Sequence, residues 1–220
     1  MIQMRKRIKD FVNRHMIADQ DAAVAVSGGP DSLALTHALA QSRVFRNIYA
    51  LTVDHGLRTG SRREAENVAE LTGTWSHVDA HILTWQAERP DTRIQEQARR
   101  ARYDLMTEFC RKRGVACLFL GHHADDQAET FFFRLSKGSG LGGLAGMRAA
   151  REENGVTLCR PFLDLHKAQL ETYCEDHGIE FVRDPSNSDR RHMRARLRAA
   201  YDALAAEGLS AEHVRSTMQR

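Results

Sequence analysis

The chain has 220 residues, 42% of them apolar and 28% charged, which suits one sizeable α/β domain of a globular protein. The net charge of +3 is too small to indicate nucleic-acid binding, which must be argued from local clusters of arginine. No apolar run approaches the ~18 residues of a membrane span, and the N-terminus lacks the apolar segment of a signal peptide. We therefore expect a cytoplasmic protein with no membrane partner. Without a C-x-x-C pair, the four cysteines are expected to be reduced core thiols and not ligands of zinc or an iron–sulfur cluster.

The first elements are a helix, a strand and a glycine-containing turn. Residues 2–16 have apolar side chains at helical spacing among lysines and arginines, which predicts an amphipathic helix. The apolar run 22–26 predicts a buried parallel strand, and a helical run follows from Leu33 to Ala40. The turn between them has two glycines that allow positive φ and bring N–H groups close to a polyanion at the helix N-terminus. Its proline suits the first helical turn, which the following Asp and Ser can cap. An ordinary strand-to-helix turn is the alternative to a phosphate-binding turn formed by Ser27, Gly28, Gly29, Pro30, Asp31 and Ser32.

The second strand is predicted at residues 47–53 and ends in Asp54-His55-Gly56. Because ligands of open α/β sheets bind beyond the carboxyl ends of the strands, Asp54 and His55 would lie beside the first turn if the two strands are neighbours. A plain turn explains these residues equally well. Residues 61–72 predict a crossover helix, and residues 77–83 predict a third strand at the sheet edge. The His and Asp side chains on one face of that strand favour a solvent-facing surface over a metal site.

A long helix is predicted at residues 94–112, with Arg99 and Arg102 near its start, and a fourth strand at 115–120. The strand leads into Gly-His-His-Ala-Asp-Asp-Gln-Ala-Glu-Thr and a further helix. Asp126 and Glu129 stand at i and i+3 on one face of this helix, and His122 lies one turn before Asp126. The helix dipole alone would explain two acids near a helix N-terminus, but it does not explain the paired histidines.

The remaining chain completes an open α/β sheet. Residues 137–146 contain five glycines and predict a mobile, adaptable loop. Residues 157–163 predict the fifth strand, and residues 165–177, 191–204 and 211–218 predict helices. We therefore expect a Rossmann-like parallel sheet of about five strands with helices on both faces, in a domain of residues 1–185 followed by a helical extension of residues 186–220.

Five motifs occur in order over residues 22–200: Ser27-Gly-Gly-Pro-Asp-Ser32, Val53-Asp-His-Gly-Leu-Arg58, Arg99-Arg-Ala-Arg-Tyr103, Gly121-His-His-Ala-Asp-Asp-Gln-Ala-Glu-Thr130 with the following Lys137-Gly-Ser-Gly140, and Asp184-Pro-Ser-Asn187 followed by Arg194-Ala-Arg-Leu-Arg198. Together they resemble the motifs of the tRNA(Ile)-lysidine synthetase family, which has the PP-loop ATP pyrophosphatase fold. One position departs from the family pattern, because Ala195 stands where members usually carry Asn. Members usually continue into C-terminal tRNA-binding domains, and we expect this chain to lack them.

The resemblance implies a reaction and a role for each motif. ATP would adenylate the C2 oxygen of the wobble cytidine of a tRNA(Ile) with a CAU anticodon, and the ε-amine of L-lysine would then displace AMP. Asp126 would accept the proton of lysine and Glu129 would hold lysine, while His122 and Arg102 would favour developing negative charge. Asp31 would also support Mg²⁺. ATP would be bound by Ser27, Gly28, Gly29, Pro30, Asp31, Ser32, Asp54 and His55. Phosphates of ATP or tRNA would be bound by Arg99, Lys137, Arg191, Arg194, Arg196 and Arg198.

Two other readings stay open. A PP-loop tRNA thiolase or an amidating synthetase of the same superfamily is the nearest, although a thiolase typically needs paired cysteines and an amidating synthetase a glutaminase domain. A catalytically silent nucleotide- or tRNA-binding module is the alternative from another class, and the acids at 31, 126 and 129 argue against it. The sequence leaves open whether the chain forms a homodimer.

Overall fold

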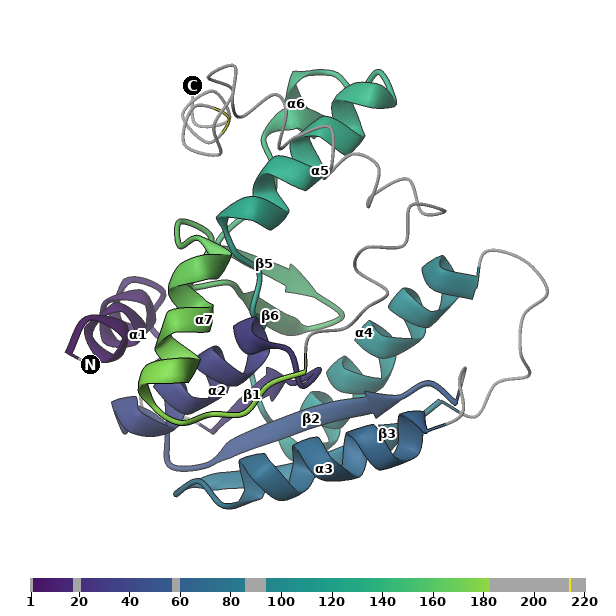
Figure 1. Ribbon diagram of the computed structural model, residues 1–220. Helices are drawn as coiled ribbons and strands as arrows, with labels where there is room; N and C mark the ends of the chain where they lie inside the picture. The colour runs from purple at the N-terminus through teal and green to yellow at the C-terminus, as the bar shows by residue number, and fades with distance from the viewer. Residues whose placement is uncertain (1, 18–20, 57–59, 86–93, 183–213, 215–220) are drawn as a thin grey trace.

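The computed structural model describes residues 2–17, 21–56, 60–85, 94–182 and 214, and Figure 1 shows their arrangement. The predicted helices at 191–204 and 211–218, the proposed domain boundary and the last arginine motif lie outside the described residues, apart from Val214. The elements in chain order are α1 (Ile2–Arg14), β1 (Ala22–Ala25), α2 (Pro30–Ser42), β2 (Ile48–Asp54), α3 (Ser61–Gly73), β3 (Val78–Thr84), α4 (Ile94–Arg113), β4 (Cys117–Phe119), α5 (Ala124–Ser136), α6 (Leu141–Leu144), β5 (Ala150–Glu153), β6 (Val156–Cys159) and α7 (Lys167–Asp176).

The strands form one six-stranded sheet in the order β3-β2-β1-β4-β6-β5. All neighbouring strands run parallel except β5, which pairs antiparallel with β6. The predicted Rossmann-like fold is confirmed, and the five predicted strands correspond to β1, β2, β3, β4 and β6. The additional strand, β5, precedes a two-residue hairpin turn at Asn154 and Gly155, whose φ angles are 52° and 75°. Asn-Gly is the sequence that such a turn favours, because both positions need positive φ.

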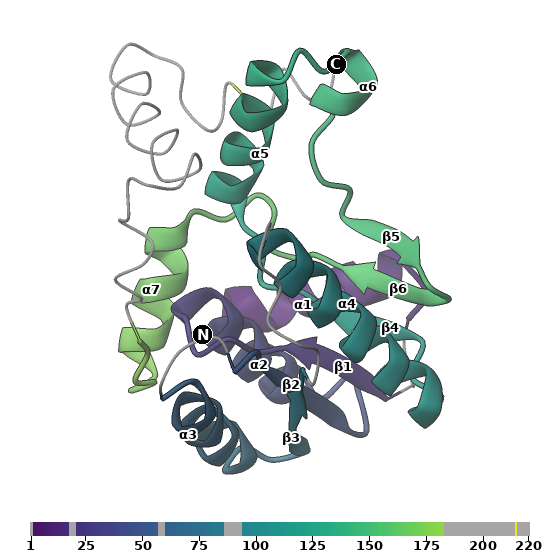
Figure 2. The same ribbon diagram turned by 90° about the vertical axis from the view of Figure 1, so that its right-hand side faces the viewer.

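Helices cover both faces of the sheet, as Figures 1 and 2 show. One core joins α1, α2, α3 and α7 to the sheet, through buried side chains such as Ile8, Leu39 and Leu170. A second core on the opposite face packs Met106 and Cys110 of α4 against the sheet. The chain adds strands on one side of β1, from β2 to β3, and then crosses over through α4 to place β4 on the other side of β1. The carboxyl ends of β1 and β4 therefore meet at the switch point where ligands of such sheets bind.

The helix α5 and the short α6 extend away from the sheet in both views (Figures 1 and 2). The glycine-rich segment predicted as a mobile loop contains α6, and hydrogen bonds tie it to α5. Gln127 donates to the Met147 carbonyl over 2.9 Å and accepts from the Met147 N–H over 2.7 Å. Arg134 donates to the carbonyls of Gly143 and Gly146. The segment therefore has a defined conformation against α5.

Other expectations concern cysteine and membrane association. All four cysteines are free and buried, as predicted. Within the described ranges, no helix is long and apolar enough to cross a membrane. On the edge strand β3, Asp79 and His81 form an ion pair 2.9 Å long. In the part of the chain that the structure describes, no group of three or more His, Cys, Asp or Glu residues could hold a metal ion.

Candidate functional site

The turn between β1 and α2 is held in shape by Ser32. The Ser27 N–H donates to the Ser32 hydroxyl over 3.1 Å, and this hydroxyl donates to the Gly29 carbonyl over 3.0 Å. Gly28 has a φ of +79°, and a Cβ there would lie 2.7 Å from Cγ2 of Val68 in α3. Among the described residues, no side chain caps α2 at Gly29, although the sequence suggested capping by its Asp and Ser. The first N–H groups of α2 are therefore available to an anion.

The end of β4 lies directly against this turn, on the other side of the switch point. A Cβ on Gly121 would be 2.9 Å from the Asp31 carbonyl oxygen and 3.1 Å from the Ser32 nitrogen. Asp31 itself is partly buried, and its Oδ1 is buried without a hydrogen-bond partner among the described residues. Burial raises the pKa of Asp31, while the nearby His123 acts in the opposite direction. The turn thus presents an unsatisfied carboxylate oxygen, which is what a cation or a bound nucleotide would satisfy.

His123 links this carboxylate to the start of α5. Its Nε2 lies 3.7 Å from Asp31 and 3.5 Å from Asp126, and its Nδ1 lies 3.3 Å from Asp125. Burial would lower the pKa of His123, but its contact with Asp125 and the charges of Asp126 and Asp31 outweigh burial and raise it. The sequence analysis assigned a role to His122 and none to His123. The Gly-His-His motif was the available signal, but only the fold shows which carboxylates surround the second histidine.

The acids of α5 have different tasks. Asp125 accepts the N–H of Lys167 over 2.8 Å and so ties the start of α5 to the start of α7. Burial would raise the pKa of Asp125, but its hydrogen bonds with His123 and the Lys167 N–H hold it well below its usual range. Asp126 accepts the N–H of His123 over 3.0 Å, and Glu129 lies half-buried one turn further along the helix. The Asp126 carboxylate is therefore held against His123 at the start of α5, and Glu129 follows at i+3 on the same helix.

His122 is held by Arg160, a residue that sequence reasoning placed only at the exit of a strand. Nε of Arg160, which is buried at the end of β6, donates to Nδ1 of His122 over 3.2 Å. The Arg160 guanidinium also donates to the Arg148 carbonyl over 3.1 Å. Burial lowers the pKa of His122 to about 4, an effect to which the positive charge of Arg160 adds. His122 is thus a neutral imidazole at neutral pH, with its proton on Nε2.

The end of β2 places Asp54 and His55 near Arg102 of α4. Asp54 is buried, and its Oδ1 accepts the Gly56 N–H over 3.0 Å and the Ser61 hydroxyl over 2.7 Å. The hydrogen bond from Ser61 lowers the pKa of Asp54, and burial opposes it. His55 Nδ1 and Arg102 Nε are both buried without a hydrogen-bond partner in the described ranges. Burial lowers the pKa of His55, and the charge of Arg102 lowers it further. Asp54 therefore ties β2 to α3, while His55 and Arg102 each have one buried nitrogen without a hydrogen-bond partner among the described residues.

Two predicted phosphate-binding residues lie at the margin. Arg99 is exposed on α4, where its guanidinium lies 5.2 Å from the centre of the Tyr103 ring. Its charge still reaches the site, since it lowers the pKa of His122. Lys137 follows the far end of α5, about 16 Å along the helix from Asp126 at 1.5 Å per residue. The structure therefore keeps Arg99 near the site and does not bring Lys137 into it. The arginines at 191, 194, 196 and 198 lie outside the described residues.

Comparisons with known proteins agree with this arrangement. A family model described as a PP-loop domain matches residues 1–202. The tRNA(Ile)-lysidine synthase of Methylobacterium nodulans is 46% identical over 197 residues, which are 90% of this chain and 58% of that protein. The tRNA(Ile)-lysidine synthase of Methylobacterium sp. strain 4-46 is 49% identical over 187 residues, which are 85% of this chain and 54% of that protein. The chain spans little more than half the length of these curated relatives.

A solved structure extends the comparison to the fold. The U34-tRNA thiolase NcsA from Methanococcus maripaludis, solved with its 4Fe–4S cluster, superposes with a TM-score of 0.78 at 15% identity. The match covers 99% of this chain and 78% of that one. At this identity the likeness concerns the fold alone.

Proposed function

Since this chain belongs to the PP-loop domain family, we propose that the protein uses ATP to join L-lysine to C2 of the wobble cytidine of a tRNA(Ile) with a CAU anticodon. The names of the two Methylobacterium relatives support the proposal. The structural observation that carries it is the position of His123, 3.7 Å from Asp31 and 3.5 Å from Asp126. Through this histidine the phosphate-binding turn and the acidic helix form one site, as a two-step reaction at a single nucleotide requires.

In the proposed first step, O2 of the cytidine attacks the α-phosphorus of ATP and pyrophosphate leaves. The turn at Gly28 and Gly29 and the uncapped start of α2 bind the phosphates through backbone N–H groups. His122 supplies its Nε2–H as a neutral donor, and Arg102 supplies positive charge. Both groups stabilise negative charge that develops on the phosphate oxygens.

Mg²⁺ belongs to this proposal, and the residues at the turn fit it. Asp31 has a buried oxygen without a partner among the described residues, and a cation beside it would counter the burial that raises its pKa. Mg²⁺ is commonly held by one or two carboxylates together with substrate phosphates, so a cage of protein ligands is not required. When bound, Mg²⁺ would neutralise charge on the phosphates and on the leaving pyrophosphate.

In the proposed second step, the ε-amine of lysine attacks C2 of the cytidine and AMP leaves with the former O2. Lysine in water is almost entirely protonated at neutral pH, so its proton must be removed near C2. Asp126 accepts this proton, and Glu129 binds the ammonium group before it reacts. The carboxylate of Asp126 is held in place by the His123 N–H. An amine held between two carboxylates explains selection of lysine over amino acids without a cationic side chain.

The test incubates the whole chain with tRNA(Ile) bearing CAU, ATP and labelled lysine, and then identifies the wobble nucleoside by mass. Asp126→Asn should slow lysine attachment by roughly 10²-fold or more while adenylated tRNA, labelled from the α-phosphate of ATP, still forms. Asp31→Asn should abolish both products. The matched control is Glu66→Gln, which removes an exposed carboxylate on α3 and should change neither step.

Three outcomes would contradict the proposal. Sulfur in the wobble nucleoside instead of lysine would indicate a thiolase. Tight binding of tRNA without any modification would indicate a binding module. Equal loss of adenylation and lysine attachment in Asp126→Asn would remove Asp126 from the second step.

A further inference from the structure

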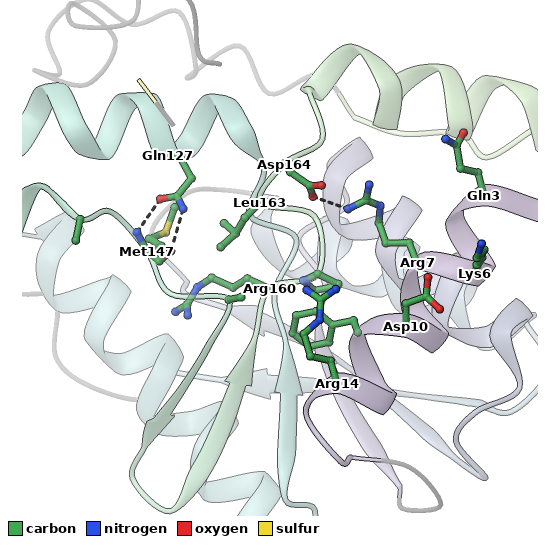
Figure 3. Close-up of a pocket in the computed structure, with 14 residues that line it drawn as sticks. Gln3, Lys6, Arg7, Asp10, Arg14, Gln127, Met147, Arg160, Leu163 and Asp164 are labelled. Atoms are coloured by element: carbon green, nitrogen blue, oxygen red, sulfur yellow. Dashed lines mark hydrogen bonds and ion pairs between the residues drawn. The ribbon is translucent and has the colours of Figure 1, made fainter. Parts of the chain in front are cut away.

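A hollow with a volume of about 610 Å³ lies beside the site, between α1, the first turn of α5 and the segment after β6 (Figure 3). One wall is a face of α1, and the opposite wall is the segment that follows α6. The hollow is no part of the phosphate-binding turn, since none of residues 27–32 lines it. Its volume falls within the range of ligand sites in proteins.

The walls are fixed by contacts already present. Gln127 and Met147 exchange two hydrogen bonds on one wall, drawn as dashed lines in Figure 3. Arg7 of α1 forms an ion pair with Asp164, which follows β6, and so joins the other wall to the sheet. The hollow is therefore preformed and needs no rearrangement of these segments before a ligand binds.

The charge of the lining favours an anion. The four cationic side chains are Lys6, Arg7, Arg14 and Arg160, and the two carboxylates are Asp10 and Asp164. The Arg7 charge is neutralised by Asp164. Lys6 and Arg14 are exposed and have no ion pair within the described ranges. Asp10, one helical turn from each of them on α1, is the remaining carboxylate of the lining, so its negative charge is outnumbered by the positive charges of Lys6, Arg14 and Arg160. Lys6 and Arg14 are therefore free to bind phosphate oxygens.

The spacing of the two free cations favours an extended polyanion over a single phosphate. Lys6 and Arg14 are eight residues apart on α1, which is about 12 Å along the helix axis. In Figure 3 the two side chains lie at separate points along the helix. A chain of phosphates can contact both cations, because it carries charges at regular intervals.

Arg160 connects the hollow to the candidate active site. Its side chain lines the hollow, and its Nε donates to His122 over 3.2 Å. A strand of RNA with one nucleotide beside His122 would therefore reach the hollow through its neighbouring nucleotides. We propose that the face of α1 with Lys6 and Arg14 binds backbone phosphates of the RNA strand whose cytidine reacts at the site, an inference that rests on the proposed function.

The experiment compares two double variants of the same helix. Lys6→Gln with Arg14→Gln removes the two cations that line the hollow, and Arg5→Gln with Lys9→Gln removes two exposed cations of α1 that do not. Binding of tRNA(Ile) is measured from low to high salt. The first variant should lower the slope of log K against log salt by about 1.4 to 1.8, which corresponds to two lost phosphate contacts. The second should leave the slope unchanged, and both should bind ATP and melt like the wild type.

Other outcomes separate this inference from the proposed function. The inference would be overturned if the two double variants had the same slope of log K against log salt, whether or not that slope differed from the wild-type value. The face of α1 with Lys6 and Arg14 would then contribute no more than the total charge of the helix. Competition by polyglutamate as strong as competition by RNA of equal charge would also overturn it, because the surface would then bind any polyanion. The two proposals can also fail separately. If the wild type formed no lysidine but only the Lys6 and Arg14 variant lost salt dependence, the proposed function would be wrong and the RNA-binding surface on α1 would stand.

Discussion

Arg160 fixes the protonation state of His122, although the two residues are 38 positions apart. The guanidinium Nε donates to Nδ1 of the imidazole over 3.2 Å, so this ring nitrogen acts as an acceptor and carries no proton. Burial and the adjacent positive charge lower the pKa of His122 to about 4. The ring therefore presents Nε2–H as a neutral donor. In the proposed reaction, the base that accepts the proton of lysine is accordingly not His122 but a carboxylate of α5.

The first prediction concerns the pH dependence of stability. The pKa of His122 is lowered from its ordinary value of 6.5, which the unfolded chain retains, to about 4 in the folded chain. Acid therefore favours the unfolded chain, which binds the proton more readily, and stability should rise from pH 4 to pH 6.5. In His122→Gln the slope of the unfolding free energy over this range should fall by up to about 1.4 kcal/mol per pH unit. Urea unfolding at a series of pH values measures the slope.

Part of the slope will remain in that variant, because burial also lowers the pKa of His37 to about 4. The double variant His37→Gln with His122→Gln should therefore show a still smaller slope of the unfolding free energy between pH 4 and pH 6.5. A slope identical in wild type and His122→Gln would show that His122 is already protonated in the folded chain, and the neutral-donor role would be wrong.

The second prediction separates the shape of the turn between β1 and α2, which we propose binds phosphate, from the stability of the helix that follows it. Ser32→Ala removes the hydroxyl that binds the Ser27 N–H and the Gly29 carbonyl, and should cost about 1 to 3 kcal/mol. Ser42→Ala, at the other end of α2, removes a hydroxyl that donates to the Leu39 carbonyl over 2.7 Å. Both variants should lose stability, but only Ser32→Ala should weaken ATP binding, by about tenfold. Calorimetric titration with ATP well below both melting temperatures measures the difference, and similar affinities in the two variants would contradict the assignment of the turn.

Much of the fold could be predicted because it depends on local patterns. Apolar runs of strand length, separated by amphipathic helices, identified the parallel strands, and the family match and the six-stranded sheet confirm the PP-loop fold inferred from the motifs. The edge strand β5 was missed because Ala150–Glu153 is polar, and its hairpin turn at Asn154 and Gly155 was not recognised. Edge strands need little burial, so hydrophobic periodicity identifies them poorly.

The site was predicted less completely, because its geometry depends on residues far apart in the chain. The roles of His123 and Arg160 follow from contacts with Asp31 and His122, and no local pattern contains those contacts. Asp54 was expected to bind ATP because it is a carboxylate directly after a strand. In the structure its hydrogen bonds hold Gly56 and Ser61, so its direct role toward ATP remains a prediction.

The third prediction tests whether the end of β4 sets the position of the proposed phosphate-binding turn. Gly121 lies so close to α2 that a Cβ would be 2.9 Å from the Asp31 carbonyl oxygen, a backbone atom that can move only with the turn. Gly121→Ala should therefore displace the start of α2, weaken ATP binding by about tenfold or more, and destabilise the fold by about 1 to 3 kcal/mol. Gly73→Ala is the matched control, because the nearest atom to its Cβ would be 3.9 Å away, an ordinary contact. If both variants bind ATP like the wild type, the close approach of β4 and α2 has no part in shaping the site.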